Sequence, residues 1–323
     1  MPHAIQVKKT GGPEVLSWAE VEPAEPGPGQ VRIRQAAAGL NFIDVYHRTG
    51  LYKQPLPFVP GVEGAGTVEG VGDGVRGLKA GDRVAYAGPI GGYAEERTID
   101  ADRLVKLPDD IAFEQAAGMM LQGMTARMLL RAVFPIEKGD TILVHAAAGG
   151  VGLILCQWAK ALGATVIGTV SNDEKAELAS AHGCAHPIIY TEQDFAAEVD
   201  KVTGGAKLPV VYDSVGNATF MKSLDCLKPR GLMVSFGNSS GPVGAFAPIL
   251  LSQKGSLFLT RPSLFHYIAT RRELEQSAGE LFDVVRSGKV KIEVKQRFPL
   301  KDAAEAHRAL ESRETAGSTI LLV

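Results

Sequence analysis

The fold is decided by one short stretch of the sequence, Ala147-Ala148-Gly149-Gly150-Val151-Gly152. It follows the apolar run Thr141–His145, which predicts a buried strand, and it leads into Val151–Leu162, whose apolar residues have helical spacing. Glycines at such a turn let the backbone approach a pyrophosphate, and the helix N-terminus offers unpaired N–H groups to it. The turn therefore predicts a dinucleotide site, although Ala147 stands where the G-x-G-x-x-G pattern has its first glycine.

The residues after this turn favour NADP(H) over NAD(H). Thr165–Val170 predicts the second strand, and a site for NAD(H) has Asp or Glu at its end to bind the ribose 2′-hydroxyl. Val170 stands there, and polar residues that suit a 2′-phosphate follow it: Ser171, Asn172 and Lys175. Asp173 and Glu174 argue the other way, unless they only stabilise the N-terminus of the next helix. A glycine-rich turn without any ligand is the remaining alternative.

Strands and helices alternate from about residue 123 to residue 262. A second helix is predicted at Asp173–His182, and later strands at Pro187–Tyr190, Val210–Asp213, Leu232–Phe236 and Ser256–Thr260. This alternation predicts βαβ units and therefore a doubly wound parallel sheet that is covered on both faces.

The two ends of the chain have a different character. Residues 1 to about 122 contain short strands separated by Gly and Pro, such as Val31–Arg34, Gly64–Gly72 and Gly81–Tyr86. After Pro262 we expect two amphipathic helices around Val290–Phe298 and then a last strand: Arg272–Ser287, Asp302–Ser312 and Ser318–Val323. The 323 residues thus predict an α/β protein of two domains.

Composition argues against several classes of protein. The chain has 34 Lys+Arg against 36 Asp+Glu and 7% aromatic residues, so it lacks the basic, aromatic surface of a nucleic-acid-binding protein. No apolar run reaches ~18 residues, and Met1–Lys9 has no apolar run of signal-peptide length, so we expect neither a membrane span nor export. Three Cys residues, none in a C-x-x-C pair, favour a reducing compartment, and we expect the cytoplasm.

Further stretches follow the pattern of one known family: Asn41–Asp44 with Arg48–Tyr52, His145–Lys160, Val211–Gly216, Gly231–Gly241 and Thr260–Ser263. Nearly from end to end, the chain resembles the zinc-independent quinone oxidoreductases of the medium-chain dehydrogenase/reductase superfamily, which are related to ζ-crystallin, and among them bacterial NADPH:quinone reductases. The resemblance implies a GroES-like, β-rich catalytic domain of residues 1–122 and 263–323. A Rossmann domain that binds NADPH, residues 123–262, would be inserted into it, and the protein would be a homodimer.

The resemblance also implies the residues of the site. Asn41, Tyr46 and Tyr52 would line the interdomain cleft near the nicotinamide, where a Tyr hydroxyl, with an ordinary pKa of about 10, could donate a hydrogen bond to the developing oxyanion. Loop packing is the alternative for Tyr52, and a turn role for Asn41. Arg127 or Met128 stands where close bacterial relatives have Tyr, so no contact is expected from that ring.

Residues of the implied cofactor site form four groups. The turn would contribute Ala148, Gly149, Gly150, Val151 and Gly152. Around the 2′-phosphate would lie Ser171, Lys175 and Tyr190. Along the ribose and nicotinamide would lie Ser214, Phe236, Gly237, Asn238, Ser239, Thr260, Arg261 and Pro262. Asn41 and Tyr46 would approach the cofactor from the catalytic domain.

No metal is expected. Zinc alcohol dehydrogenases of this superfamily have Cys where this chain has Asn41, and Gly-His-Glu where it has Gly61-Val62-Glu63, and neither Asn nor Val is an ordinary zinc ligand. The structural-zinc lobe needs four Cys residues, and residues 86–103 contain none. His145, His182 and His186 are expected to be structural.

Without zinc, the expected chemistry is transfer of hydride, or of electrons, from NADPH to a quinone. The first alternative is an NADPH-dependent reductase of alkenals or enones on the same fold. The second is a binding or structural role like that of ζ-crystallin, including single-stranded RNA, against which the charge and the aromatic content argue. The sequence leaves open the physiological acceptor, the proton donor and the number of electrons in each step.

Overall fold

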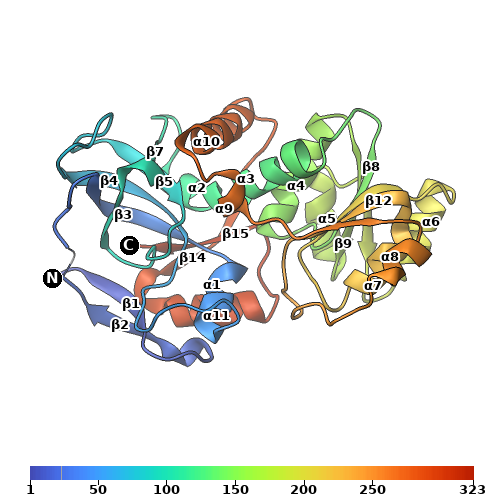
Figure 1. Cartoon of the computed structure of the whole chain (residues 1–323), viewed down its shortest axis with the longest axis horizontal. Coiled ribbons are helices and arrows are strands. Elements are labelled where there is room, and N and C mark those ends of the chain that lie inside the picture. The colour runs from blue at the N-terminus through green and yellow to red at the C-terminus, as the bar shows by residue number, and fades with distance from the viewer. Residues whose placement is uncertain (23) are drawn as a thin grey trace. The chain divides into compact units, whose positions relative to one another are not determined.

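The computed structural model describes residues 1–22 and 24–323, which form two compact units (Figure 1). Unit 1 comprises Met1–Met124, Ile268–Phe282 and Ile292–Val323. Unit 2 comprises Thr125–Tyr267 and Asp283–Lys291.

Unit 2 is built on a six-stranded parallel sheet with the strand order β10-β9-β8-β11-β12-β13. In chain order, its strands are β8 (Thr141–Val144), β9 (Thr165–Val170), β10 (His186–Ile189), β11 (Leu208–Asp213), β12 (Leu227–Ser235) and β13 (Phe258–Thr260). The chain runs outward from β8 to β10 and then returns to β11 on the other side of β8. Because every strand is parallel, all their carboxyl ends lie along one edge of the sheet, and the direction of winding changes between β8 and β11.

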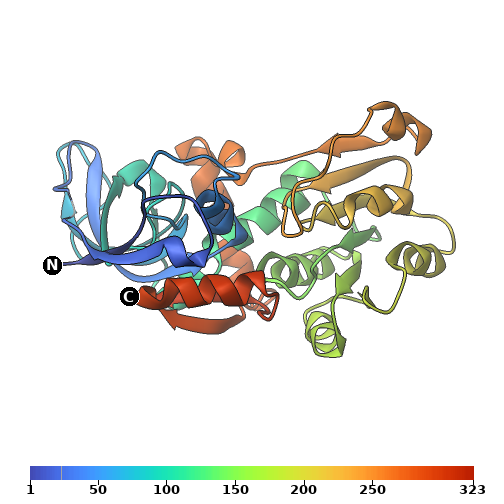
Figure 2. The same ribbon diagram turned by 90° about the horizontal axis from the view of Figure 1, so that it is seen from below.

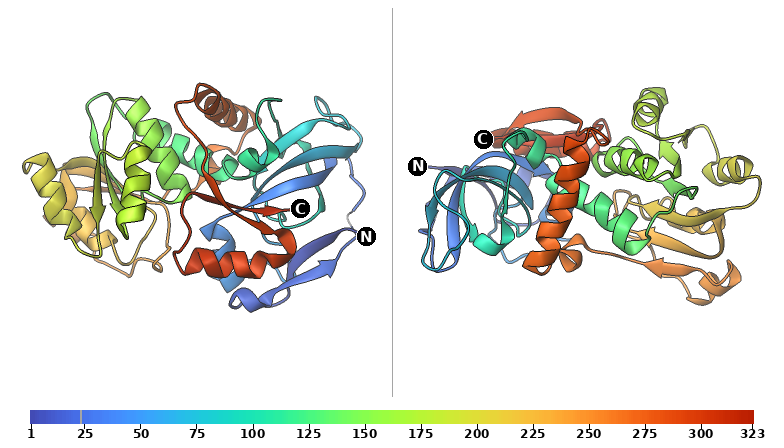
Figure 3. Two further views of the ribbon diagram at one scale, coloured as in Figure 1. Left: turned by 180° about the vertical axis from the view of Figure 1, so that it is seen from behind. Right: turned by 90° about the horizontal axis from the view of Figure 1, so that it is seen from above.

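Helices connect these strands and lie on both faces of the sheet (Figure 3). They are α4 (Gly150–Ala161), α5 (Asp173–Ala181), α6 (Phe195–Thr203), α7 (Phe220–Ser223) and α8 (Ile249–Gln253). On one face, Leu143, Ile167 and Val211 pack against Phe195 and Phe220 from the helices. The strands β8, β9 and β11 are buried over nearly their whole length, so they appear in the sequence as mostly apolar runs. The predicted doubly wound parallel sheet is confirmed.

Unit 1 contains a seven-stranded sheet with the order β14-β15-β3-β4-β5-β7, in which β6 also pairs with β3. Its strands are β3 (Gln30–Leu40), β4 (Glu63–Val71), β5 (Arg83–Ala87), β6 (Glu96–Asp100), β7 (Val105–Lys106), β14 (Val294–Pro299) and β15 (Ser318–Leu322), and a separate pair is β1 (His3–Val7) with β2 (Leu16–Glu20). β15 pairs antiparallel with β3, so that Thr319 lies opposite Leu40. Segments from both ends of the chain therefore share one sheet (Figure 2).

The remaining helices are α1 (Phe42–Thr49), α2 (Phe113–Ala117), α3 (Met120–Met128), α9 (Leu264–Tyr267), α10 (Arg271–Arg286) and α11 (Ala303–Glu311). The short strands expected in residues 1–122 are present, but no helix was predicted there, and α1, α2 and the start of α3 lie in this range. The apolar and polar residues of α1 do have helical spacing, but its eight residues make only about two turns, which is too short a window for the period to stand out. Its polar side chains Asp44, His47 and Arg48 are buried by the rest of the fold.

The turn before α4 depends on a glycine, which gives the first prediction. A methyl group on Gly152 would overlap the carbonyl oxygens of Ala146 and Ala147, whereas one on Gly279, within α10, would meet nothing within 4 Å. We expect Gly152→Ala to lower the free energy of unfolding by about 1–3 kcal/mol. The matched exchange Gly279→Ala should raise it by roughly 0.5–1 kcal/mol, because alanine favours the helix. Urea denaturation followed by circular dichroism measures both, and equal effects of the two exchanges would contradict the close approach.

Candidate functional site

The turn between β8 and α4 is held by the neighbouring strands. The N–H of Ala147 donates to Thr169 O at 3.0 Å, and the N–H of His145 donates to Tyr212 O at 3.0 Å. Ala146 has the left-handed backbone conformation, with φ of 53°, so the chain turns sharply before Gly149. The helix then starts at Gly150, and the first N–H groups of an α-helix have no partner within it.

This turn fits a dinucleotide phosphate. Gly152 brings α4 so close to the backbone of residues 146–147 that no side chain has room there. Gly149 presents bare backbone, because a methyl group added to it would approach only Ala146 O, at 3.2 Å. A pyrophosphate needs this combination of bare backbone and unpaired N–H groups at a helix N-terminus. Ala148, Gly149, Gly150, Val151 and Gly152 therefore lie where the sequence places a phosphate cradle.

The residues predicted around a 2′-phosphate end two neighbouring strands. Ser171 follows β9, and Tyr190 follows β10 and donates its N–H to Val170 O at 3.0 Å. Thr191 Oγ1 donates to Ser171 O at 3.0 Å, which ties the two loops together. Lys175 lies in the first turn of α5, whose N-terminus is capped because Asn172 Oδ1 accepts its N–H at 3.0 Å. The Tyr190 side chain is 41% exposed, so its ring is accessible at this corner.

The loops after β11, β12 and β13 are bound to one another along the same edge. Asp213 Oδ1 accepts the N–H groups of Val215 and Gly216 at 2.7 and 3.0 Å and thereby shapes the loop of Ser214. Gly237 packs so closely on Ser214 that a methyl group there would overlap its carbonyl group.

Two further hydrogen bonds connect the remaining predicted residues along the same edge of the sheet. Ser239 donates its N–H to Ser214 O at 3.2 Å, and Arg261 Nη1 donates to Gly237 O at 3.1 Å. The last group therefore lies together at one end of unit 2: Phe236, Gly237, Asn238, Ser239, Thr260, Arg261 and Pro262.

In unit 1, the three predicted substrate residues belong to α1 and its two ends. Asn41 is the N-cap residue of α1, Tyr46 lies in its second turn, and Tyr52 follows its end. The Tyr52 N–H donates to Tyr46 O at 3.0 Å, and the two rings meet edge to face with centroids 5.2 Å apart. The sequence did not predict α1, yet this helix is what brings the three residues together.

Asn41 is clamped on both sides of its carboxamide by residues that the sequence did not indicate. Its Nδ2 donates to Glu63 Oε2 at 2.7 Å, and its Oδ1 accepts from Gln122 Nε2 at 3.1 Å. Gln122 Oε1 in turn accepts from Ser318 Oγ at 2.6 Å. These contacts join β4, α3 and β15, so no local pattern in the sequence could have shown them.

Two buried carboxyl groups adjoin Asn41. Glu63 also accepts the Leu121 N–H at 2.8 Å, while Asp44 Oδ2 accepts the Asn41 N–H at 2.9 Å and the Tyr93 hydroxyl at 3.0 Å. Burial raises the pKa of Glu63 to about 8 and that of Asp44 to about 7, because a buried charge loses its hydration.

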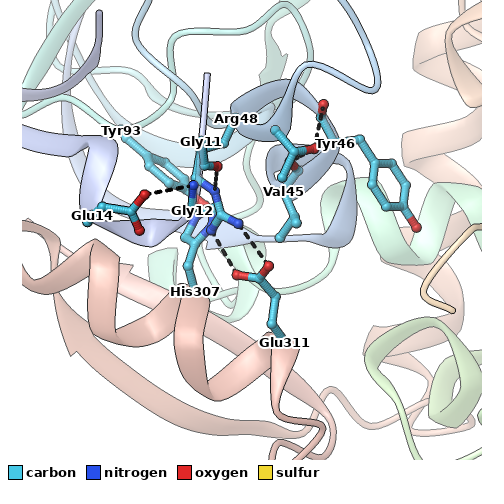
Figure 4. Close-up of polar contacts among 10 residues, drawn as sticks. Gly11, Gly12, Glu14, Val45, Tyr46, Arg48, Tyr93, His307 and Glu311 are labelled. Carbon is cyan, nitrogen blue, oxygen red and sulfur yellow. Dashed lines mark hydrogen bonds and ion pairs between the residues drawn. The ribbon is translucent and has the colours of Figure 1, made fainter. Parts of the chain in front are cut away.

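Arg48 fixes α1 from the side opposite to Tyr46 (Figure 4). The Arg48 guanidinium, 1% exposed, donates two hydrogen bonds of 2.8 Å to Glu311 on α11 and a third to Gly11 O at 3.1 Å. It also contacts His307 Nδ1 at 3.0 Å, and burial, together with the Arg48 charge, lowers the pKa of His307 to about 3. Because residues 46 and 48 lie on opposite faces of a helix, this anchor leaves the Tyr46 ring directed away from it.

The positions that hold zinc ligands in zinc alcohol dehydrogenases have another chemistry here. Asn41 and Glu63 are bonded to each other, and Val62 contributes an apolar side chain. Within residues 1–22 and 24–323, no group of three His, Cys, Asp or Glu side chains could hold a metal ion. His145 is buried between Thr169 Oγ1 and Ser223 Oγ, at 2.9 and 2.8 Å, as a structural histidine would be.

Comparison with known proteins agrees with both units. Residues 27–109 match the alcohol dehydrogenase GroES-like domain, and residues 150–283 match the zinc-binding dehydrogenase family. The chain is 55% identical to the quinone oxidoreductase of Pseudomonas aeruginosa, with 100% of both chains covered. The chain belongs to the quinone oxidoreductase family of the medium-chain dehydrogenases/reductases.

Two further relatives are similar to this chain over nearly its full length. The crystal structure of Escherichia coli quinone oxidoreductase complexed with NADPH has a TM-score of 0.98 and 51% identity, and covers 99% of this chain and 100% of that one. A 2-haloacrylate reductase of Burkholderia is 46% identical over 100% of this chain and 99% of its own. The predicted family and its combination of GroES-like and Rossmann folds are confirmed. None of the helices described is long and apolar enough to span a membrane.

The buried carboxyl groups of unit 1 predict how stability depends on pH. Folded Asp44 and Glu63 keep protons up to about pH 7 and 8, whereas the unfolded chain releases them near its ordinary values of 3.8 and 4.5. His47 and His307, with pKa values lowered to about 4 and about 3, oppose this trend only below about pH 6.5. From pH 6.5 to 8 the free energy of unfolding should therefore fall, by at most about 1.4 kcal/mol per pH unit for each proton.

Urea denaturation at half-unit steps of pH measures this slope. Glu63→Gln should flatten it, while the same exchange at the exposed residue Glu192 should not. A slope that rises over this interval would contradict the burial argument.

Proposed function

We propose that this protein is an NADPH-dependent quinone oxidoreductase. The observation that carries the proposal is a full-length likeness to quinone oxidoreductases, combined with a phosphate cradle whose second strand, β9, ends at Val170 and Ser171 rather than at an acidic residue, with Lys175 in the next helix. A carboxylate after β9 would repel a 2′-phosphate, whereas a hydroxyl group and an ammonium group bind one. Tyr190 would be the third residue around the 2′-phosphate.

The chain's own residues would bind and orient the reactants. When bound, NADPH supplies a hydride, which a quinone accepts together with a proton to become a hydroquinone. The turn 148–152 would hold the pyrophosphate, and the loops of Ser214, 236–239 and 260–262 the ribose and nicotinamide. Asn41, Tyr46 and Tyr52 would face the substrate, where the Asn41 amide and a Tyr hydroxyl would donate hydrogen bonds to the oxygen that gains charge.

NADPH oxidation with a panel of quinones and enones tests the function, with NADH as the control cofactor. We expect turnover of at least one quinone and a preference for NADPH. No turnover of any quinone would refute the proposal, and a preference for NADH would refute the assignment of the 2′-phosphate corner.

A second candidate function is the reduction of an activated alkene. The 2-haloacrylate reductase that is 46% identical to this chain favours it, because a haloacrylate is a conjugated acid rather than a quinone. The same assay separates the two, since this function predicts faster turnover of the enones than of the quinones.

A charge reversal at Lys175 tests the phosphate corner. Lys175→Glu should raise the KM for NADPH about tenfold or more, since it replaces an attractive charge by a repulsive one, and should change that for NADH far less. The matched control is Lys201→Glu on α6, at the surface of the same unit. Equal effects of Lys175→Glu on both cofactors would show that this residue does not approach the phosphate.

We further propose that the protein is a cytoplasmic homodimer. All three cysteines, Cys156, Cys184 and Cys226, are free and buried, which suits a reducing compartment. β13 is the last strand of its sheet, and Phe258 and Ile249 nearby are 62% and 61% exposed. An exposed apolar edge strand is a surface on which a second copy could pair across a two-fold axis.

The dimer is tested by a charge on that strand. The wild-type protein should have a mass of about 68 kDa in light scattering after gel filtration, twice the 34.2 kDa of one chain. Phe258→Glu should shift it toward one chain, whereas Met221→Glu, at another exposed apolar residue of unit 2, should not. A wild-type protein that elutes as a single chain would refute the proposal.

A further inference from the structure

The contacts of Asn41 form a chain of hydrogen bonds with a direction. Ser318 Oγ donates to Gln122 Oε1, Gln122 Nε2 donates to Asn41 Oδ1, and Asn41 Nδ2 donates to Glu63 Oε2. Each amide in the middle has a donor end and an acceptor end, so either could be turned by 180° only if its neighbours turned too. The direction of the whole chain must therefore be fixed at one of its ends.

Ser318 cannot fix the direction. Its hydroxyl group lies 2.6 Å from Gln122 Oε1 and 2.7 Å from Gly118 O, and it has one hydrogen for both. If Gln122 turned, Ser318 could donate to Gly118 O and accept from Gln122 Nε2. A hydroxyl group serves either direction equally well.

Glu63 can fix it. Its two carboxylate oxygens accept hydrogen bonds from the Asn41 Nδ2 group and from backbone N–H groups at the start of α3, among them that of Leu121. An ionised carboxylate only accepts hydrogen bonds, and the backbone donor cannot turn, so Asn41 must present its nitrogen to Glu63. An amide nitrogen carries two hydrogens, and Glu63 takes one of them.

We propose that Glu63 is a positioning residue that sets which way round the Asn41 carboxamide stands, and so places the second Nδ2 hydrogen where the substrate oxygen needs a donor. The proposal rests on the proposed function, because it concerns how Asn41 meets the quinone. Glu63 itself is fully buried and acts only through Asn41.

Exchanging the side chains of residues 63 and 122 distinguishes a positioning role of Glu63 from a purely structural one. In Glu63→Gln, the new side chain keeps its oxygen on the Leu121 N–H and turns its nitrogen toward Asn41. Asn41 and Gln122 must then both turn, and Ser318 accepts a hydrogen bond from Gln122 instead of donating one. Adding Gln122→Glu supplies an acceptor on the other side of Asn41. In the double variant Glu63→Gln/Gln122→Glu, every partner is satisfied, but the direction of the chain is reversed.

Stability and activity should then respond differently. Glu63→Gln alone should change the Tm little, because the chain can reverse. Gln122→Glu alone should lower the Tm by about 4 °C or more, because Glu63 still holds the Asn41 nitrogen and the new carboxylate then faces Asn41 Oδ1 in a buried site. The double variant should recover most of this loss and still have a kcat/KM at least tenfold below wild type, with NADPH affinity within twofold. The control double variant Glu63→Gln/Gln35→Glu has the same composition. Gln35 is buried and donates to Gly92 O and Ala94 O rather than to Asn41, so no recovery of the Tm lost in Gln35→Glu is expected.

Three outcomes overturn the proposal. The first is a double variant without recovery of Tm, which would show that the chain does not turn. The second is recovery of both Tm and activity, which would show that direction does not matter. The third is a Glu63→Gln effect on kcat/KM that persists when Asn41 is also replaced by Ala, because Glu63 would then act by another route.

The pH profile gives a further readout that a structural role would not move. Only ionised Glu63 fixes the direction, and the ionisable side chains that face it are Asp44 on α1, Tyr86 on β5 and Tyr93. In wild type kcat/KM should rise as pH passes through about 8, where Glu63 ionises, and this limb should be absent in Glu63→Gln. The Tm values of the single and double variants can be measured without any turnover, so this test stands even if the proposed function fails.

Discussion

The antiparallel pairing of β15 with β3 is the constraint on which the rest of unit 1 depends. Its register sets Thr319 opposite Leu40, one residue before Asn41, and so brings Ser318 to the side of α1 where the carboxamide is held. The same strand also carries β14 and, through the chain before it, α11 with Glu311. A one-residue slip in this pairing would turn every side chain of β15 to the opposite face of the sheet and separate both anchors from α1.

The two units hold their functional residues by different physical means. In unit 2 the parallel sheet holds these residues, because its six strands end on one edge and their loops are connected mainly by backbone hydrogen bonds. In unit 1 the holding groups are buried side chains with charges and amides, such as Arg48 with Glu311 and Asn41 with Glu63. Backbone geometry tolerates changes of side chain, whereas a buried polar network fails when a single partner is lost.

This difference explains what could be predicted from the sequence. Strand β9 was predicted with its observed bounds, Thr165–Val170, and α4 and α5 within one residue at each end, because buried strands and amphipathic helices follow local periods. Helix α1 was missed because its eight residues make only about two turns. Glu63 was placed beside Asn41 only through the comparison with zinc alcohol dehydrogenases. Gln122 and Ser318 could not have been linked to Asn41 without the fold, since 81 and 277 residues separate them from it along the chain. The assignment of Asn41, Tyr46 and Tyr52 came from the family resemblance alone and stays a prediction.

The order of the strands along the chain also bears on how the protein is made. The sheet of unit 2 is complete once Thr260 has been synthesised, whereas the sheet of unit 1 lacks β14 and β15 until residues 294–322 follow. During synthesis, the nucleotide-binding sheet can therefore form while β3 still has an open edge, a row of unpaired backbone groups at risk of pairing with another chain. The strand that completes the support of Asn41 is the same one that closes this edge.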